Sequence, residues 1–256
     1  MDKMLYIAMS GAKQNMNALA INANNLANAK TTGFKADLAQ ARSMQAFGEG
    51  LPTRVFSMTE KASQNFDSGA LQTTGRDLDI AVQGPGMIAV QAKDGLEAYT
   101  RDGHLTITEE GYLQTPNGDL VMGDTGPVFL PLPVNNIKIS KDGTIMVQPA
   151  GAPASIQEEV GRIKLVNPDV RDLTRGNDGL FRVNAQAEPN NIAQNNVLDA
   201  DVNVVIQNGM LESSNVNPVS EMTEMIALQR QFEMQLKLMK TAEEIDSASA
   251  SLLRAF

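Results

Sequence analysis

The C-terminal stretch of the chain constrains its fold most, because it reads as one long helix. Residues 219–256 follow Asn217-Pro218 and contain no glycine or proline, the residues least compatible with a helix interior. Ser220 and Glu221 offer N-cap and first-turn chemistry. A helix of this length would extend about 57 Å at 1.5 Å per residue. Because that is too long to lie on a compact core, we expect the helix to protrude or to meet a partner.

Apolar side chains recur along this segment at steps of three and four, which is the spacing of a coiled-coil seam. The repeat comprises Met222, Met225, Phe232, Leu236, Met239, Ala242, Ile245 and Leu252. Methionine stripes usually fill the core of the chain that carries them, since the thioether adapts to irregular gaps. Here little core is available to cover so long a helix, so contact with neighbouring chains is the stronger interpretation.

The N-terminal end shows a similar but weaker pattern. Between Asp2 and about Lys30 there is no proline and one glycine, Gly11. The same spacing links a small and partly polar set: Leu5, Ala8, Ala12, Asn15, Leu19, Asn22 and Leu26. Such a helix would be marginal alone, because burial of an amphipathic face supplies most helical stability. We expect the two terminal helices to pair, and both to become ordered only when neighbouring chains bury their stripes.

The middle of the chain predicts a meander of short strands. Turn signals recur at Asp94-Gly95, Asp102-Gly103, Glu110-Gly111 and Asn117-Gly118, with β-branched or alternating segments between them. Further strands are expected at 78–83, 87–91, 137–140, 144–148, 160–166 and 180–184. The predicted fold is α+β, with long helices from both termini paired as a coiled-coil-like stalk and a central, mainly antiparallel β domain. Its segments are an N-terminal stalk (1–35), a connector (36–75), a β-rich domain (76–205) and a C-terminal stalk (206–256).

Composition narrows the classes of function. The chain has 21 Lys and Arg against 30 Asp and Glu, a formal net charge of −9, and a surface of this sign repels nucleic acid. We therefore expect no nucleic-acid partner. No apolar run approaches the roughly 20 residues that span a bilayer, and the N-terminal residues lack the apolar core of a signal peptide. We expect neither a membrane span nor a cleaved signal.

Motifs that could carry chemistry have simpler interpretations. Gly84-Pro85-Gly86 follows a strand, as a dinucleotide fingerprint would, but the next residues continue as strand and do not open a helix. The alternating carboxylates of Asp199 and Asp201 lack the glycine and the later carboxylate of a calcium loop. His104 is the single histidine and there is no cysteine, which excludes the usual zinc ligand sets. We predict no catalytic residue, no metal site and no cofactor.

One motif remains unexplained by local structure. Asparagines crowd the end of the N-terminal helix, in the string Ala23-Asn24-Asn25-Leu26-Ala27-Asn28-Ala29-Lys30-Thr31-Thr32-Gly33-Phe34-Lys35. Asparagine is a poor helix-interior residue, so these amides need another reason, such as hydrogen bonds to a partner surface. Gly33 can close the helix in the left-handed conformation, and Phe34 can fold back onto Leu26 or Ala29.

This string resembles the N-terminal signature of the flagellar axial proteins, the family of rod, hook and hook-associated subunits. Three other segments are also similar to that family: Leu211–Met222, Thr74–Val82 and Tyr99–Gly103. Pro85 departs from the acidic residue or asparagine that is common at its position, which affects only a turn. The opening Tyr6–Ala12 and the continuation Gly33–Leu38 are most similar to proximal rod subunits. The distal rod subunit is an alternative, and a carbohydrate-binding β domain unrelated to flagella is a more remote one.

The resemblance implies a structural subunit and not an enzyme. Its terminal helices would polymerise with other rod subunits into a helical assembly that forms the axial drive shaft and the wall of the export channel. The implied location is the periplasmic rod of the basal body, reached through the flagellar export apparatus. The expected assembly interface comprises Leu5, Ala8, Ala12, Leu19, Asn24, Asn25, Leu26, Asn28, Gly33, Phe34, Met222, Met225, Phe232, Leu236, Met239, Ile245 and Leu252.

Overall fold

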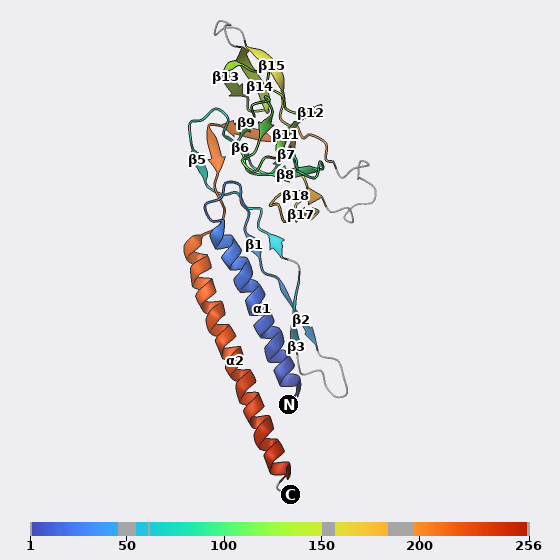
Figure 1. Cartoon of the computed structure of the whole chain (residues 1–256), viewed down its shortest axis with the longest axis vertical. Helices are drawn as coiled ribbons and strands as arrows, with labels where there is room; N and C mark the ends of the chain where they lie inside the picture. Colours follow the sequence, from blue (N-terminus) through green and yellow to red (C-terminus); the bar gives the residue numbers. More distant parts are fainter. Residues whose placement is uncertain (1, 46–54, 61, 150–156, 184–196, 255–256) are drawn as a thin grey trace. The chain divides into compact units, whose positions relative to one another are not determined.

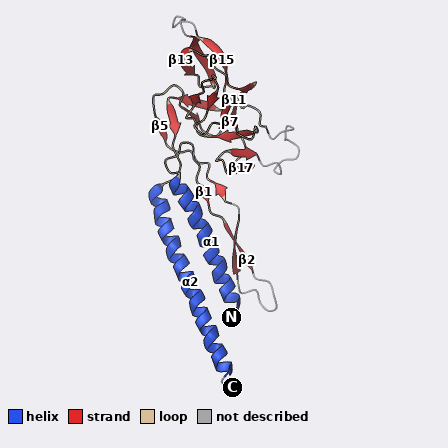
Figure 2. Cartoon of the chain, viewed as in Figure 1, coloured by secondary structure: helices blue, strands red, loops and turns tan. Residues whose placement is uncertain are grey.

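The computed structural model describes residues 2–45, 55–60, 62–149, 157–183 and 197–254 (Figure 1). Contacts between residues divide the chain into two compact units. The helical unit comprises Met1–Ala29, Lys35–Asp67 and Asn215–Phe256, and the β unit comprises Lys30–Phe34 and Ser68–Ser214. Both long helices belong to the first unit and most described strands to the second; Figure 2 distinguishes the helices from the strands by colour. The predicted α+β class, with paired terminal helices and a mainly antiparallel β domain, is confirmed.

The helical unit is built on helices α1 (Asp2–Ala27) and α2 (Pro218–Arg254), which run antiparallel and pack along each other (Figure 1). Helix α2 begins at Pro218 because the fixed φ of proline suits the first helical position. The cap differs from the prediction: Asn217, and not Ser220, accepts hydrogen bonds at Oδ1 from the amides of Val219 (3.1 Å) and Ser220 (3.4 Å).

The segment expected to be a connector carries strands of its own. Strand β1 (Asp37–Leu38) pairs with β4 (Ser63–Gln64), and β2 (Ala41–Gln45) pairs with β3 (Val55–Thr59). The β2–β3 hairpin packs along α1 through β3. There the Thr59 hydroxyl donates to Gln14 Oε1 at 2.6 Å and accepts from Asn17 Nδ2 at 3.2 Å. The polar, glycine-interrupted composition of this segment suggested a connector, because a hairpin that packs through hydrogen bonds shows no apolar alternation.

The β unit contains a nine-stranded sheet and smaller ones, and all pairings among the described strands are antiparallel. The large sheet follows the order β17 (Leu173–Arg175), β18 (Phe181–Val183), β8 (Glu97–Thr100), β7 (Met87–Gln91), β11 (Leu120–Gly123), β10 (Leu113–Gln114) and β9 (Thr106–Ile107), with β12 (Gly126–Pro127) on β11 and β16 (Leu165–Val166) on β7. A three-stranded sheet contains β13 (Val134–Ile139), β14 (Thr144–Pro149) and β15 (Glu158–Arg162). Two further pairs join β6 (Ile80–Gln83) to β19 (Val205–Asn208) and β5 (Leu71–Thr73) to β20 (Met210–Glu212).

One apolar cluster fills the β unit. Ile88, Leu105, Val121, Leu130 and Ile145 are each fully buried in it. The predicted meander is present in part: β9, β10 and β11 pair in chain order, but β8 pairs with β7 and not with β9. The single strand expected at 160–166 is two strands, β15 and β16, which lie in different sheets. Burial of this cluster stabilises the unit independently of the helices.

Candidate assembly interface

The seam between α1 and α2 is narrow and built from small residues on α1. Ala12 and Ala18 are buried there, and Gly11 lies so close to Gln235 that an added Cβ would come within 2.6 Å of Nε2. Near the other end of the pair, Asn25 hydrogen-bonds the Glu221 side chain. Fourteen residues separate the two positions on each helix, so both contacts fit one antiparallel register. Small residues at these positions allow the helices to approach closely.

The same seam buries polar atoms without hydrogen-bond partners. They are Asn15 Nδ2, Asn22 Nδ2, Glu221 Oε2 and Gln235 Oε1. Burial raises the pKa of Glu221, the hydrogen bond from Asn25 opposes this rise, and the charge of Glu224 adds to it. An unpartnered buried polar group costs about 1–3 kcal/mol. The pairing of the two helices within one chain is therefore weaker than their length suggests.

The asparagine-rich string is largely satisfied within the chain. Asn25 is 2% exposed, and its amide both donates to the Asp37 carbonyl and accepts from the Asp37 amide, each at 2.9 Å. Asn28 Nδ2 donates to the carbonyl of Asn24 at 2.9 Å. The Asn25 side chain thus pairs with the Asp37 backbone as a neighbouring strand would. This pairing sets the direction in which the chain leaves α1. Sequence reasoning assigned these amides to a partner surface because local spacing gives no sign of the Asp37 contact.

The end of the string, Lys30–Phe34, belongs to the β unit. Gly33 has φ of 67° and is buried, with its amide donating to the Glu212 carbonyl at 2.8 Å. Thr32 Oγ1 donates to Asp102 Oδ1 at 2.7 Å. The Arg175 guanidinium lies 4.8 Å from the centre of the Phe34 ring. The left-handed conformation predicted for Gly33 is present, and it docks this segment on the strands.

Both helices keep apolar side chains exposed outside the seam. On α2 the exposed set is Val219, Met222, Ile226, Met234, Leu236, Leu238 and Ile245, and on α1 it is Tyr6, Met9 and Met16. Met234, Leu238 and Ile245 share one face, because they follow one another at steps of four and seven. We call these three residues the α2 stripe. Its members are 58%, 48% and 53% exposed, which is unusual for a helix face that has no partner.

The residues expected at the interface therefore separate into three groups. Leu5, Ala8, Leu19, Leu26, Met225, Phe232 and Met239 are half-buried, as are Asn28 and Phe34, and Ala12, Asn25 and Gly33 are buried. Asn24, Met222, Leu236 and Ile245 are exposed. The side chain of Leu252 lies outside the described residues. We expected that the chain itself could bury neither of the two predicted apolar seams. The half-buried side chains on α1 and α2 show instead that the chain covers part of each seam.

Sequence reasoning missed Tyr6, Met9, Met16, Ile226, Met234 and Leu238 as exposed apolar residues. It followed one seam per helix, whereas each helix carries apolar residues on a second face as well. A search for a second apolar repeat would have found the α2 stripe.

The β2–β3 hairpin adds another apolar surface to the helical unit. The Thr59 side chain turns toward α1, as its hydroxyl bonds with Gln14 and Asn17 show, and the Ser57 amide donates to Ser10 Oγ. The alternate positions face the other way, and Met44 stands opposite Phe56 in the register there. Met44 and Met58 are 44% and 42% exposed. The hairpin thus directs its polar face inward and its apolar face outward.

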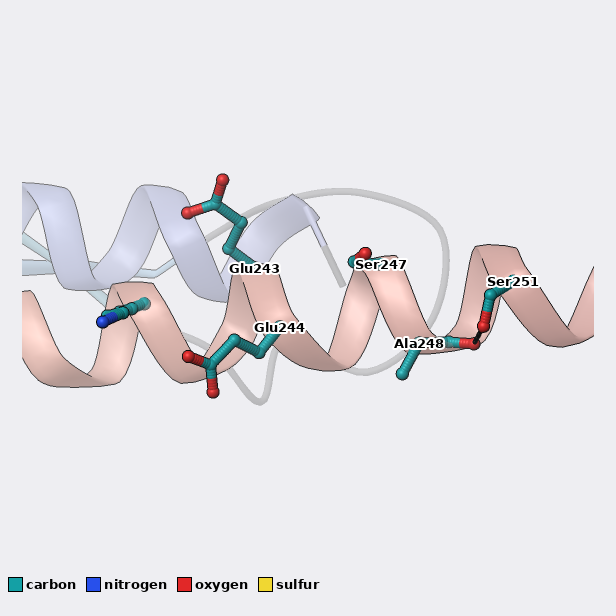
Figure 3. A pocket seen from close by; sticks show the side chains of 6 residues that line it. Glu243, Glu244, Ser247, Ala248 and Ser251 are labelled. Carbon is teal, nitrogen blue, oxygen red and sulfur yellow. Dashed lines mark hydrogen bonds between the residues drawn. The ribbon is translucent and has the colours of Figure 1, made fainter.

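Hollows on the helices offer no enclosed site. Figure 3 shows a depression on α2 whose lining residues are Lys240, Glu243, Glu244, Ser247, Ala248 and Ser251. All six are exposed and come from one helix, and the two glutamate side chains point in different directions (Figure 3). Among the described residues, no group of three or more His, Asp or Glu side chains is placed to hold a metal ion. Neither described helix is long and apolar enough to cross a membrane.

An antiparallel pair of terminal helices with open apolar faces, in a chain that also forms a separate β unit, is typical of a structural subunit that assembles with others. Comparison with known families gives that class a name. Residues 5–35 match the flagella basal body rod protein family, residues 81–147 the D1 domain of the flagellar hook proteins FlgE/F/G, and residues 207–252 the C-terminal region of the flagellar basal body rod proteins FlgEFG. The chain belongs to the flagellar basal-body rod family, as the resemblance in its sequence predicted.

Relatives place the chain within that family. It is 41% identical to the flagellar basal-body rod protein FlgF of Salmonella typhimurium and 39% identical to that of Escherichia coli, in each case over 253 residues and 99% of both chains. A flagellar basal-body rod protein FlgG from Bacillus subtilis is 29% identical over 265 residues, or 98% of both chains. These matches favour the proximal rod subunit over the distal alternative.

Proposed function

We propose that this chain polymerises through the exposed apolar faces of its terminal helices into the wall of the proximal rod. Its neighbours there are other rod subunits. The α2 stripe carries the proposal, because it is an exposed apolar face on a helix that already contacts α1 along a neighbouring face. The residues expected at the interface take two roles. The buried ones shape the helix pair. The exposed Met222 and Leu236 contact neighbours together with the α2 stripe, which includes Ile245, and with Tyr6, Met9 and Met16.

The magnitude of the apolar contact shows why many subunits are needed. Burying a large apolar side chain completely contributes about 1.5–3 kcal/mol, and the side chains of the α2 stripe are already about half covered. The stripe would therefore contribute roughly 3–4 kcal/mol, which is below the roughly 4–15 kcal/mol that association costs. Two subunits joined by one such contact would separate. A helical assembly engages several surfaces of each subunit at once, because its contacts do not close into a small ring.

The proposal extends to the route and the location of the subunit. The subunit reaches the periplasmic rod through the flagellar export apparatus without a cleaved signal peptide, and the assembled helices line the export channel. Unpartnered polar atoms in the α1–α2 seam support this route, because a weakly held pair unfolds easily for passage and re-forms at the growing end. The proposal assigns no catalytic role, in keeping with relatives that are named as rod proteins.

A matched pair of substitutions tests the interface. Met234 and Leu96 are both 58% exposed, but Met234 belongs to the α2 stripe and Leu96 to the β unit. In cells that lack their own copy of the gene, Met234→Asp should reduce the subunit in purified basal bodies at least tenfold and abolish swimming. Leu96→Asp should be incorporated like the wild type, and both purified variants should melt within a few degrees of it. Normal incorporation of Met234→Asp would refute the interface.

A further inference from the structure

One buried ion pair in the β unit has no role in the proposed interface. Arg101 follows β8 and Glu212 ends β20, and Arg101 Nη1 lies 3.1 Å from Glu212 Oε2. The side chains are 5% and 1% exposed. A buried pair of this kind often contributes little net stability, because removing two charges from water costs about as much as their attraction returns. A role in fixing conformation explains its presence better.

The pair is the centre of a hydrogen-bond network that joins distant parts of the chain. Arg101 donates from Nη1 to the Val82 carbonyl at 3.1 Å and from Nη2 to the Gly84 carbonyl at 2.6 Å. Glu212 accepts the Gly69 amide at Oε1 (2.9 Å) and the Gly33 amide at its own carbonyl (2.8 Å). Arg101 and Glu212 thus bind four backbone groups in three segments of the chain, with Gly33 bound by the main chain of Glu212.

Two glycines bring backbone directly against this network. A Cβ added at Gly33 would collide with the backbone of Arg101 and Asp102, and one added at Gly69 would collide with the Ser213 carbonyl. Backbone approach this close is possible only without a side chain. Gly33 and Gly69 are therefore pressed onto the two segments that carry Arg101 and Glu212.

The segments held here are the ones by which the chain enters and leaves the β unit. The boundaries of that unit fall at residues 30, 34, 68 and 214. Gly33 lies in the short segment Lys30–Phe34, Gly69 follows the boundary at residue 68, and Glu212 stands two residues before the boundary at residue 214. All of these passages are consequently tied to one buried pair.

We propose that Arg101 and Glu212 form a clasp. The pair holds together the segments by which the chain enters and leaves the β unit, at the boundaries near residues 30, 34, 68 and 214. The inference rests on the proposed rod function, because a rod that acts as the axial drive shaft carries torque through the helices that form its wall. With the clasp closed, torque that reaches the β unit arrives through one tied joint. Without the clasp, the connecting segments are no longer held to one another. The β unit can then rotate locally while the assembled helices stay in place.

Amide hydrogen exchange on the free full-length chain tests the clasp without any assembly step. In the doubly apolar variant Arg101→Met with Glu212→Met, the Gly69 amide loses its acceptor and the Glu212 backbone that accepts from Gly33 loses its anchor. We expect protection of both amides to fall at least tenfold. The Ala89 amide, which donates to the Lys164 carbonyl at 3.0 Å inside the β unit, should keep its protection. The double variant leaves no buried charge unpaired, so we expect it to fold.

Two results would overturn the clasp. In one, Gly33 and Gly69 stay protected in the double variant. In the other, Ala89 loses protection together with them, which would make the pair a general support of the core. In cells, the double variant should enter basal bodies normally but swim at less than half the wild-type speed in viscous medium, and unchanged speed there would also count against it. Failure of the rod proposal itself would appear separately, as normal incorporation of Met234→Asp.

Discussion

Replacing Asn22 by leucine should strengthen the helix pair. Asn22 is 5% exposed in the α1–α2 seam, and its Nδ2 has no hydrogen-bond partner. Leucine has nearly the same shape and removes the unpartnered amide, which costs about 1–3 kcal/mol where it stands. Leucine also buries more apolar surface, which adds stability. It is slightly larger than asparagine, and overpacking, which costs about 1–3 kcal/mol, offsets part of that added stability. The expected net effect is a stabilisation of about 2 kcal/mol.

Circular dichroism at 222 nm measures this effect on the full-length chain. Almost all of the helical signal comes from α1 and α2, of 26 and 37 residues. For a unit of about 100 residues, 1 kcal/mol shifts the melting temperature by about 4–8 °C, so Asn22→Leu should raise the helical melting temperature by roughly 10 °C.

Asn24 provides the control for this measurement, because it lies two residues further along the same helix and is exposed. Asn24→Leu should change the free energy of unfolding by less than about 0.5 kcal/mol. Equal melting temperatures for Asn22→Leu and the wild type would show that the buried amide costs nothing. A lower one would show that a partner satisfies it in solution.

Two further substitutions test single features. Thermal unfolding should show that Gly33→Ala destabilises the β unit by several kcal/mol, because the new Cβ collides with the Arg101 backbone and the left-handed conformation is strained. Gly75→Ala is the control, since it has the same strain at φ 71° but no atom within 4 Å of the new Cβ. Equal losses of stability in the two variants would contradict this account. Burial raises the pKa of Glu221, so the stability it contributes is present at low pH and is lost as the pH rises through the raised pKa. Glu221→Gln should therefore melt above the wild type at about pH 7 and close to it at about pH 4, and a difference independent of pH would show that Glu221 does not titrate in the seam.

The sequence predicted the parts of the fold that local pattern controls. Residues 219–256 lack helix breakers, and α2 extends from Pro218 to Arg254. The regularly spaced glycines predicted the meander, because turns are encoded by a few adjacent residues. Strands β5, β19 and β20 were missed, since each pairs with a partner more than a hundred residues away and their own segments show no alternation.

The interface was predicted less well, for a physical reason. Periodicity shows that a helix has an apolar face, but it does not show which face the chain itself covers. Met225 and Phe232 turned toward α1, while Met234 and Leu238 stayed exposed. Likewise, the segments around Arg101 and Glu212 were both noted as similar to the family, yet nothing in either segment predicts a buried pair formed across 111 positions of the chain.

The placement of Lys30–Phe34 in the β unit affects how the protein can be divided for study. A fragment cut out as one continuous piece, such as residues 36–205, would lack both this segment and Glu212. Its ends would leave the Arg101 guanidinium buried without its carboxylate and remove the backbone that covers Asp102. A faithful excision would instead join Lys30–Phe34 to Ser68–Ser214 through a designed linker, so that an isolated domain retains the segment that the signature string contributes to it.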